Sequence, residues 1–155
     1  MRWIAVLFLL LPSLAQANDW DALSEPGAIA IMRHALALGT GDPASLTIGD
    51  CSTQRNLDER GRAQARTIGD GFRERGSTFD TVLSSQWCRT RETADLLDLG
   101  PVMEALPINS FFRDFSTRDQ QTAETLELIA ETDGRLMLVT HQVNISALTG
   151  KSTRS

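Results

Sequence analysis

One short stretch constrains the fold of this 155-residue chain more than any other. It is the apolar run Ala28-Ile29-Ala30-Ile31-Met32, which is followed directly by Arg33 and His34. An apolar run of this length, bounded by Gly27 and a glycine-rich segment at 39–41, predicts a buried strand. Such strands are typical of parallel sheets that are covered by helices on both faces. Ligands of open α/β sheets bind just beyond the carboxyl ends of the strands, so Arg33 and His34 are expected at a binding site.

The only other histidine repeats this arrangement. Leu136-Met137-Leu138-Val139-Thr140 is a second apolar run, and it ends at His141. A third predicted strand, 80–85, ends in Ser84-Ser85 shortly before Arg89. Strands that alternate with helical periodicity predict an α/β domain with a mostly parallel sheet. The expected helices are 58–76, 89–97, a stripe through Ala123, Leu126, Ile129 and Ala130, and 143–148, with an edge strand at 102–106 and a polar lead-in at 18–26.

Two imidazoles and two guanidiniums at one sheet edge favour an anionic ligand. A zinc site is the alternative, but two histidines without a carboxylate at fixed spacing form a thin ligand set, and arginines repel a cation. Arginine forks match phosphate oxygens, and a neutral imidazole can attack phosphorus. Nearby positive charge should keep His34 neutral, as a nucleophile must be. We therefore expect neither a metal nor an organic cofactor.

Four motifs, in this order along the chain, resemble the histidine phosphatase superfamily, relatives of phosphoglycerate mutase. They lie within Ala28 to Gly150, nearly the whole of the expected mature chain. Glycine often follows each histidine in this family, whereas Ala35 and Gln142 follow here. The motifs are Met32-Arg33-His34-Ala35, Leu57-Asp58-Glu59-Arg60-Gly61-Arg62-Ala63-Gln64-Ala65, Ser84-Ser85-Gln86-Trp87-Cys88-Arg89-Thr90-Arg91-Glu92-Thr93-Ala94 and Val139-Thr140-His141.

The resemblance implies a three-layer α/β sandwich and a site for phosphomonoester hydrolysis through a phosphohistidine intermediate. His34 would be the nucleophile, and Arg33, Arg89 and His141 would hold the phosphoryl group. Arg55 precedes the matched helix and could reach the pocket, although an ordinary exposed arginine fits the sequence equally well. The alternative function is a non-catalytic or truncated remnant that binds phosphorylated ligands.

The resemblance leaves the proton donor open. Larger relatives use an acidic residue in the segment after the helix that carries the pocket arginine. Asp114, in Phe111-Phe112-Arg113-Asp114-Phe115, is the first candidate here, and Glu104 is the second. A donor is required only for poor leaving groups.

The first residues resemble an export signal. Arg2, the apolar segment Ile4 to Leu11 and the small-residue site Ala15-Gln16-Ala17 predict a signal peptide at 1–17 and one domain at 18–155, with an uncleaved anchor as the alternative. The mature protein would be periplasmic or secreted, with no membrane span. This location suggests a phosphorylated small molecule as substrate, such as a sugar phosphate or a lipopolysaccharide phosphate.

The charge and the two cysteines agree with export. Cleavage would remove Arg2 and change the net charge from −5 to −6, which argues against nucleic acid as a partner. Cys51 and Cys88 are the only cysteines, and an oxidising compartment favours a disulfide between them over two buried thiols. The loop 35–55 would then recognise the substrate, because loops over the end of a sheet commonly carry specificity.

The chain has only fourteen residues after His141. Members of the resembled family usually continue from the following helix into another strand. The fold is therefore expected to lack the last strand of its sheet, which would expose a strand edge and favour association. The tail from Lys151 is expected to be disordered.

Overall fold

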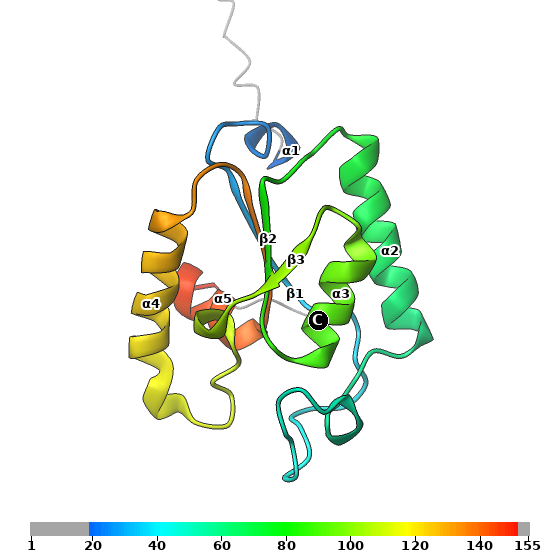
Figure 1. The fold of residues 1–155 in the computed structure, drawn as a ribbon, viewed down its shortest axis with the longest axis vertical. Coiled ribbons are helices and arrows are strands. Elements are labelled where there is room, and N and C mark those ends of the chain that lie inside the picture. Colours follow the sequence, from blue (N-terminus) through cyan, green and yellow to red (C-terminus); the bar gives the residue numbers. More distant parts are fainter. Residues whose placement is uncertain (1–18, 152–155) are drawn as a thin grey trace, which may run out of the picture.

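The computed structural model describes residues 19–151, and one parallel sheet lies at its centre (Figure 1). The strand order is β1-β4-β2-β3, and all three neighbouring pairs are parallel. This confirms the predicted α/β fold with a parallel sheet. The strands are β1 (Ile29–Arg33), β2 (Thr81–Ser84), β3 (Val102–Glu104) and β4 (Leu136–Thr140), and the helices are α1 (Asp19–Ala22), α2 (Glu59–Glu74), α3 (Cys88–Leu97), α4 (Arg118–Glu131) and α5 (Gln142–Thr149).

Helices cover both faces of the sheet, which gives the three expected layers (Figure 1). Alternate strand residues face opposite sides, so each strand contributes to two cores. Met137 and Val139 of β4 pack with Leu97 of α3 on one side. Leu136 and Leu138 pack towards α4 on the other side. A strand that is apolar on both faces needs cover on both, which explains the unbroken apolar runs in the sequence.

Strand register brings the two histidines to one level of the sheet. Arg33 is the register partner of Thr140, and the amide of His34 donates to the carbonyl of Thr140 at 3.0 Å. His34 and His141 therefore leave neighbouring strands side by side. All five residues of β4 are buried, so His141 directly follows the most buried strand of the sheet.

Helix α2 begins and ends where the sequence predicts. The side chain of Asp58 caps its first turn by accepting from the amide of Gly61 at 2.8 Å. Gly76, with φ of 66°, follows the last turn, and its amide donates to the carbonyl of Arg73. Gly61 also lets α2 approach the chain after β1, because a Cβ there would lie 2.0 Å from the carbonyl oxygen of Leu36.

Two sequence predictions are wrong at the residue level. The polar lead-in contains α1, whose Trp20 packs edge-to-face on Phe72 with ring centroids 5.3 Å apart. The predicted apolar stripe of α4 is also misplaced, because Leu126 is 53% exposed. Thr125 is the fully buried residue of this helix, and its hydroxyl donates to the carbonyl of Pro107 at 2.8 Å.

The disulfide between Cys51 and Cys88 is present and joins the loop 35–55 to the start of α3. Within residues 19–151, β1 and β3 are the two edge strands and no strand follows α5. None of the helices in that range is both long and apolar enough to cross a membrane. The predicted signal peptide at 1–17 and most of the predicted disordered tail lie outside the described residues.

Candidate active site

His34 is the first residue after β1, and its ring is held in one tautomer. Its Nδ1 lies 2.7 Å from the carbonyl oxygen of Ala35, an acceptor, so Nδ1 carries the proton and donates. The other ring nitrogen, Nε2, accepts from Nε of Arg89 at 3.1 Å. Burial lowers the pKa of His34 to about 3, and the charges of Arg89, Arg33 and Arg55 act in the same direction, against the Ala35 hydrogen bond. The result is a neutral imidazole with its Nε2 lone pair at the site.

Arg89, in the first turn of α3, has hydrogen-bond partners at each of its three guanidinium nitrogens. Its Nη1 and Nη2 donate to the two carboxylate oxygens of Asp42 at 2.6 and 3.0 Å, and Nη1 also lies 3.3 Å from the carbonyl oxygen of Arg55. The remaining donor, Nε, is directed at Nε2 of His34. Because the end of the guanidinium is anchored on Asp42, Nε is fixed beside the position that a phosphoryl group on Nε2 would take.

Asp42 is a site residue that sequence reasoning missed. Its side chain is only 6% exposed, and the Arg89 side chain only 3%. Trp87 donates its indole N–H to Oδ2 at 3.1 Å, and the amide of Arg55 donates to Oδ1 at 3.3 Å. Burial alone would raise the pKa of Asp42, but the hydrogen bonds and charge of Arg89, with the Trp87 and Arg55 bonds, lower it below its usual value. The only sequence signal was an aspartate in a glycine-rich loop near the arginines.

His141 is held by a chain of hydroxyls. Its Nε2 lies 2.8 Å from Oγ of Ser85, which in turn lies 2.6 Å from Oγ1 of Thr90. The ring packs edge-to-face against His34 and Trp87, with centroids 5.5 and 5.2 Å away. Burial lowers the pKa of His141 well below its usual value, and neighbouring positive charge lowers it further. Both histidines are therefore neutral at pH 7.

Arg33 and Arg55 line the same cavity as the histidines. Arg33 is half-buried, and its Nη1 lies 3.5 Å from Oε1 of Gln142. Arg55 bonds the backbone of the loop, donating from Nε to the carbonyl of Gly41 at 2.8 Å and from Nη1 to that of Ala37. The structure thus brings Arg33, Arg55 and Arg89 to one place, and Arg55 also shapes the loop around Asp42.

Two further motif residues hold the turn after His34. The amide of Ala35 donates to Oγ1 of Thr93 at 3.0 Å, and the amide of Leu36 donates to Oε1 of Gln64 at 2.8 Å. Gln64 lies on α2 and Thr93 on α3. These bonds position the Ala35 carbonyl that accepts the hydrogen bond from Nδ1, so Gln64 and Thr93 help to orient His34 without contacting it.

The candidate proton donors do not lie with these residues. The carboxylate of Asp114 accepts from the amide and hydroxyl of Ser116 at 3.0 and 2.6 Å and so caps a short 3-10 helix, Phe115–Thr117. The Ser116 hydrogen bonds lower the pKa of Asp114, whereas a general acid requires a raised one. Glu104 pairs with Arg91 at 3.0 Å. Neither carboxylate lines the cavity.

The cavity has a volume of about 490 Å³ at the carboxyl edge of the sheet, within the range of sites for organic ligands. The two histidines line the cavity together with Arg33, Arg55 and Arg89, and the segment 111–118 contributes Phe111, Phe112 and Phe115 as well as Arg113 and Arg118. Asp42 is the only carboxylate among the described lining residues. Between residues 19 and 151, no cluster of three or more His, Cys, Asp or Glu side chains could hold a metal ion.

Comparison with known proteins agrees with this geometry. Residues 29–108, just over half of the chain, match the histidine phosphatase superfamily (branch 1). The chain belongs to this superfamily. The match covers β1, the nucleophile candidate and Arg89, and His141 lies beyond it. The resemblance seen in four motifs is therefore confirmed.

Individual members of the histidine phosphatase superfamily show how far the likeness extends. The mitochondrial serine/threonine-protein phosphatase Pgam5 of Drosophila grimshawi is 37% identical over 82 residues, 53% of this chain but only 28% of that protein. SixA of Agrobacterium tumefaciens, a candidate phosphohistidine phosphatase, has a TM-score of 0.57 and 25% identity, covering 77% of this chain and 71% of its own. A phosphoserine phosphatase of Entamoeba histolytica, in complex with 3-phosphoglyceric acid, has a TM-score of 0.57 and 14% identity, over 77% and 76%.

Proposed function

We propose that this protein is a phosphomonoester hydrolase that forms a phosphohistidine intermediate at His34. One observation carries the proposal: Nδ1 of His34 is fixed as a donor, and Nε2 accepts a hydrogen bond from Nε of the anchored Arg89. An unprotonated nitrogen beside anchored guanidinium donors is the arrangement that in-line attack on phosphorus requires.

The reaction has two steps. Nε2 attacks phosphorus, an N–P bond forms, and the bond between phosphorus and the ester oxygen breaks. The Ala35 carbonyl stabilises the positive charge that develops on the ring, because it accepts the Nδ1–H bond. The leaving group departs as its oxyanion and takes a proton from solvent. Water then attacks phosphorus and loses a proton to solvent, the N–P bond breaks, and inorganic phosphate leaves. Arg33, Arg55 and the Nε edge of Arg89 hold the phosphoryl oxygens in both steps, and His141 contributes a neutral ring beside them.

Export, as predicted from residues 1–17, remains part of the proposal. An envelope or sugar phosphate, including a phosphate of lipopolysaccharide, would then be the available substrate. This choice depends on the compartment and on no feature of the cavity. The similarity to a serine/threonine-protein phosphatase and to a phosphoserine phosphatase supports the reaction class.

Intact-protein mass spectrometry tests the intermediate. After mixing with a generic aryl phosphate and a rapid quench without acid, the wild type should carry one phosphate adduct. His34→Ala should lose both the adduct and phosphate release. Arg89→Ala should lower kcat by roughly 100-fold to 1000-fold, as removal of one transition-state donor does. Tight binding of phosphate without any turnover would instead identify a non-catalytic binder. An adduct that persists in His34→Ala would show that another residue is the nucleophile.

A further inference from the structure

The aromatic wall of the cavity, Phe111, Phe112 and Phe115, has only its first residue buried in the core. Phe112 and Phe115 are 54% and 57% exposed, yet both line the cavity. Three of the six phenylalanines of the chain lie in the five residues 111–115. Large apolar side chains that gather in the open beside a polar pocket indicate a ligand surface.

This wall is preformed. Phe115 stacks edge-to-face on the buried Phe111 and on Phe112, with ring centroids 5.8 and 6.1 Å apart. The Asp114 cap fixes the turn that carries Phe115. Arg113 ties the segment to the loop 35–55 through a 3.4 Å contact with the carbonyl oxygen of Ala44. A ligand would therefore bind without ordering the segment first.

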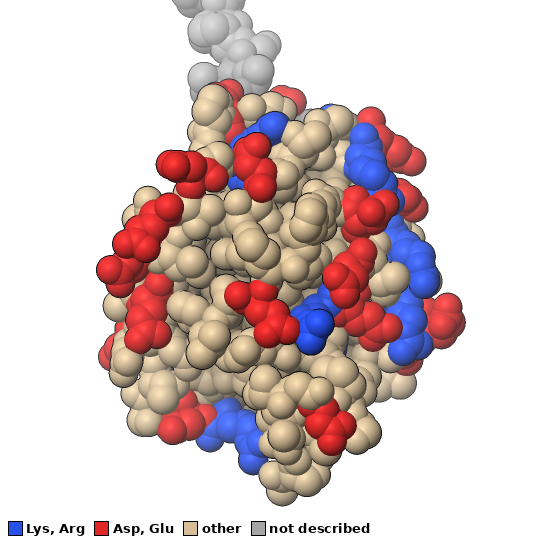
Figure 2. All heavy atoms as spheres, in the orientation of Figure 1, with Lys and Arg blue, Asp and Glu red and all other residues tan. Residues whose placement is uncertain are grey.

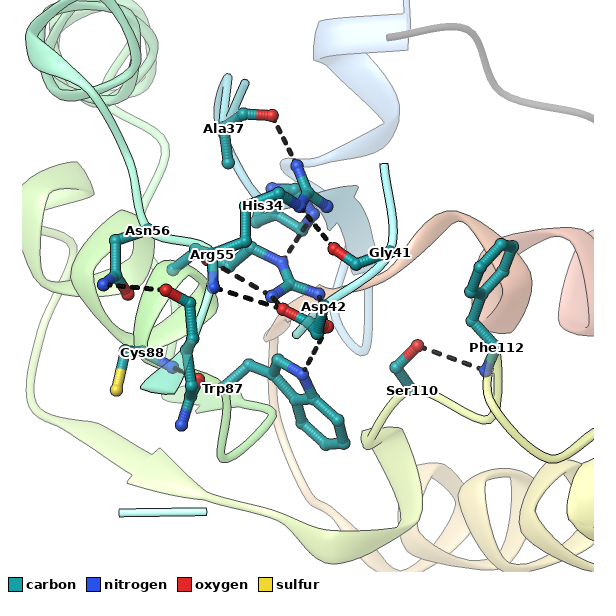
Figure 3. A network of polar contacts seen from close by, with 12 residues as sticks. His34, Ala37, Gly41, Asp42, Arg55, Asn56, Trp87, Cys88, Ser110 and Phe112 are labelled. Carbon is teal, nitrogen blue, oxygen red and sulfur yellow. Dashed lines mark hydrogen bonds and ion pairs between the residues drawn. The ribbon is translucent and has the colours of Figure 1, made fainter. Parts of the chain in front are cut away.

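The wall stands opposite the phosphate end of the cavity. In Figure 3, Ser110 lies between Phe112 on one side and Asp42 and Trp87 on the other. Val143 and Ala147 of α5 add apolar surface to the same cavity. A substrate whose phosphoryl group lies at His34 would thus place its leaving group beside aromatic and apolar side chains, with Arg113 and Arg118 also lining the same cavity.

The protonation states of the lining residues also favour a substrate with a stable leaving group. Asp42, the only carboxylate among the described lining residues, is held ionised by Arg89, and both histidines are neutral. No described lining residue is therefore ready to protonate a departing alkoxide. Phenols have a pKa of about 10, so a phenolate leaves far more readily than an alkoxide.

We infer that the preferred substrates are aryl phosphates, with the aromatic ring on Phe112 and Phe115. This inference rests on the proposed phosphatase reaction and narrows its substrate to esters of phenols, whether free or on a tyrosine side chain. It competes directly with the sugar-phosphate expectation, because a sugar phosphate such as glucose 6-phosphate presents a polar alkoxide leaving group.

Three probes separate the two grounds for this inference. Phenyl phosphate has both the ring and the good leaving group, phosphoramidate has a good leaving group without a ring, and glucose 6-phosphate has neither. The kcat for phenyl phosphate should exceed that for glucose 6-phosphate by about 100-fold or more, the contribution of the missing general acid. In Phe112→Ala, the kcat/KM ratio of phenyl phosphate to phosphoramidate should fall about fivefold to tenfold.

Leu126→Ala is the matched control, since Leu126 is equally exposed on α4 but does not line the cavity, and it should keep the wild-type ratio. Equal or faster turnover of glucose 6-phosphate would overturn the inference and leave the phosphatase intact. An unchanged ratio in Phe112→Ala would show that the aromatic wall does not contribute to substrate binding. Absence of both phosphate release and a His34 adduct with all three probes would overturn the proposed function and this inference together.

Discussion

At the scale of single residues, two parallel hydrogen bonds join Arg89 to the carboxylate of Asp42, an arrangement called the fork below. The fork determines which guanidinium nitrogen can contact a bound phosphoryl group. A buried arginine without a partner is costly, so the carboxylate stabilises the fold as well as orienting the donor. The fork occupies the end of the guanidinium and leaves the Nε edge facing His34. Asp42 is therefore a positioning residue, since it acts on the phosphoryl group only through Arg89.

Asp42→Asn tests this role. Asparagine has a similar shape but only one acceptor oxygen and no charge, so Arg89 should lose its fixed orientation. We expect kcat to fall roughly tenfold to 100-fold, part of the value of one transition-state donor. Steady-state kinetics beside a thermal melt separates misalignment from unfolding. A folded variant with wild-type or higher kcat would show that the carboxylate competes with phosphate for Arg89.

Because both histidines are neutral in the folded protein, the free energy of unfolding should decrease as the pH is lowered. The pKa of His34 falls from 6.5 to about 3 on folding, and that of His141 also falls. Below pH 6.5 the unfolded chain binds protons that the folded protein does not, so stability is lost as pH falls from about 6.5 towards 3. The slope should approach 1.4 kcal/mol per pH unit for each histidine.

Urea unfolding between pH 7.5 and 5.0 measures this slope in a range where carboxylates hardly titrate. His34→Asn removes one of the two groups and should reduce the slope by about half. The same slope in wild type and variant would mean that His34 is already accessible to protons in the folded state.

At the scale of elements, the glycines of α2 set how closely the helices pack. A Cβ on Gly69 would lie 2.1 Å from the carbonyl oxygen of Leu97 in α3, whereas one on Gly71 would meet only the end of the Arg75 side chain at 3.5 Å. Gly69→Ala should therefore destabilise the protein by about 1–3 kcal/mol, despite the helix preference of alanine.

Gly71→Ala, two residues away in the same helix, is the control. It should stabilise the protein by roughly 0.5–1 kcal/mol, because the gain in helix propensity meets no packing cost. Thermal unfolding of the two variants side by side measures both effects. Equal stabilisation by both would show that α2 and α3 separate freely.

The elements that sequence patterns predict well are those whose burial follows from their own residues. The runs that end at His34 and His141 are apolar throughout, and α2 has both its cap and its terminal glycine. Leu126 and Trp20 were misjudged because their environment depends on distant partners. Thr125 takes the inward position on α4 since the Pro107 carbonyl is there to accept its hydroxyl. Trp20 packs on Phe72, which lies more than fifty positions further along the chain.

The same distinction applies to the site. Arg33, His34 and His141 end strands whose register places them together, so their proximity could be predicted. Asp42 reaches Arg89 across 47 positions of sequence, through a loop whose path is fixed by the Cys51–Cys88 disulfide and by the backbone bonds of Arg55. No periodic pattern encodes such a path.

At the scale of the whole molecule, positive charge is concentrated in the pocket and negative charge prevails outside it. Acidic side chains gather over α4, and over α2 they alternate with basic ones (Figure 2). The net charge of the chain is −5, yet Arg33, Arg55 and Arg89 meet in one cavity. Such a field admits a small phosphorylated anion and repels a long polyanion such as nucleic acid.

Strand order also governs when the site comes into existence. β4 is the last strand in the described part of the chain, but it lies between β1 and β2. Before its synthesis, β1 has no neighbour in the sheet, and His34 follows an unpaired segment. A ribosome-bound chain must therefore wait for residues 136–141 before the two halves of the sheet can close around them. His34 and His141 are therefore brought together only in this late step, so the proposed site cannot form gradually during translation.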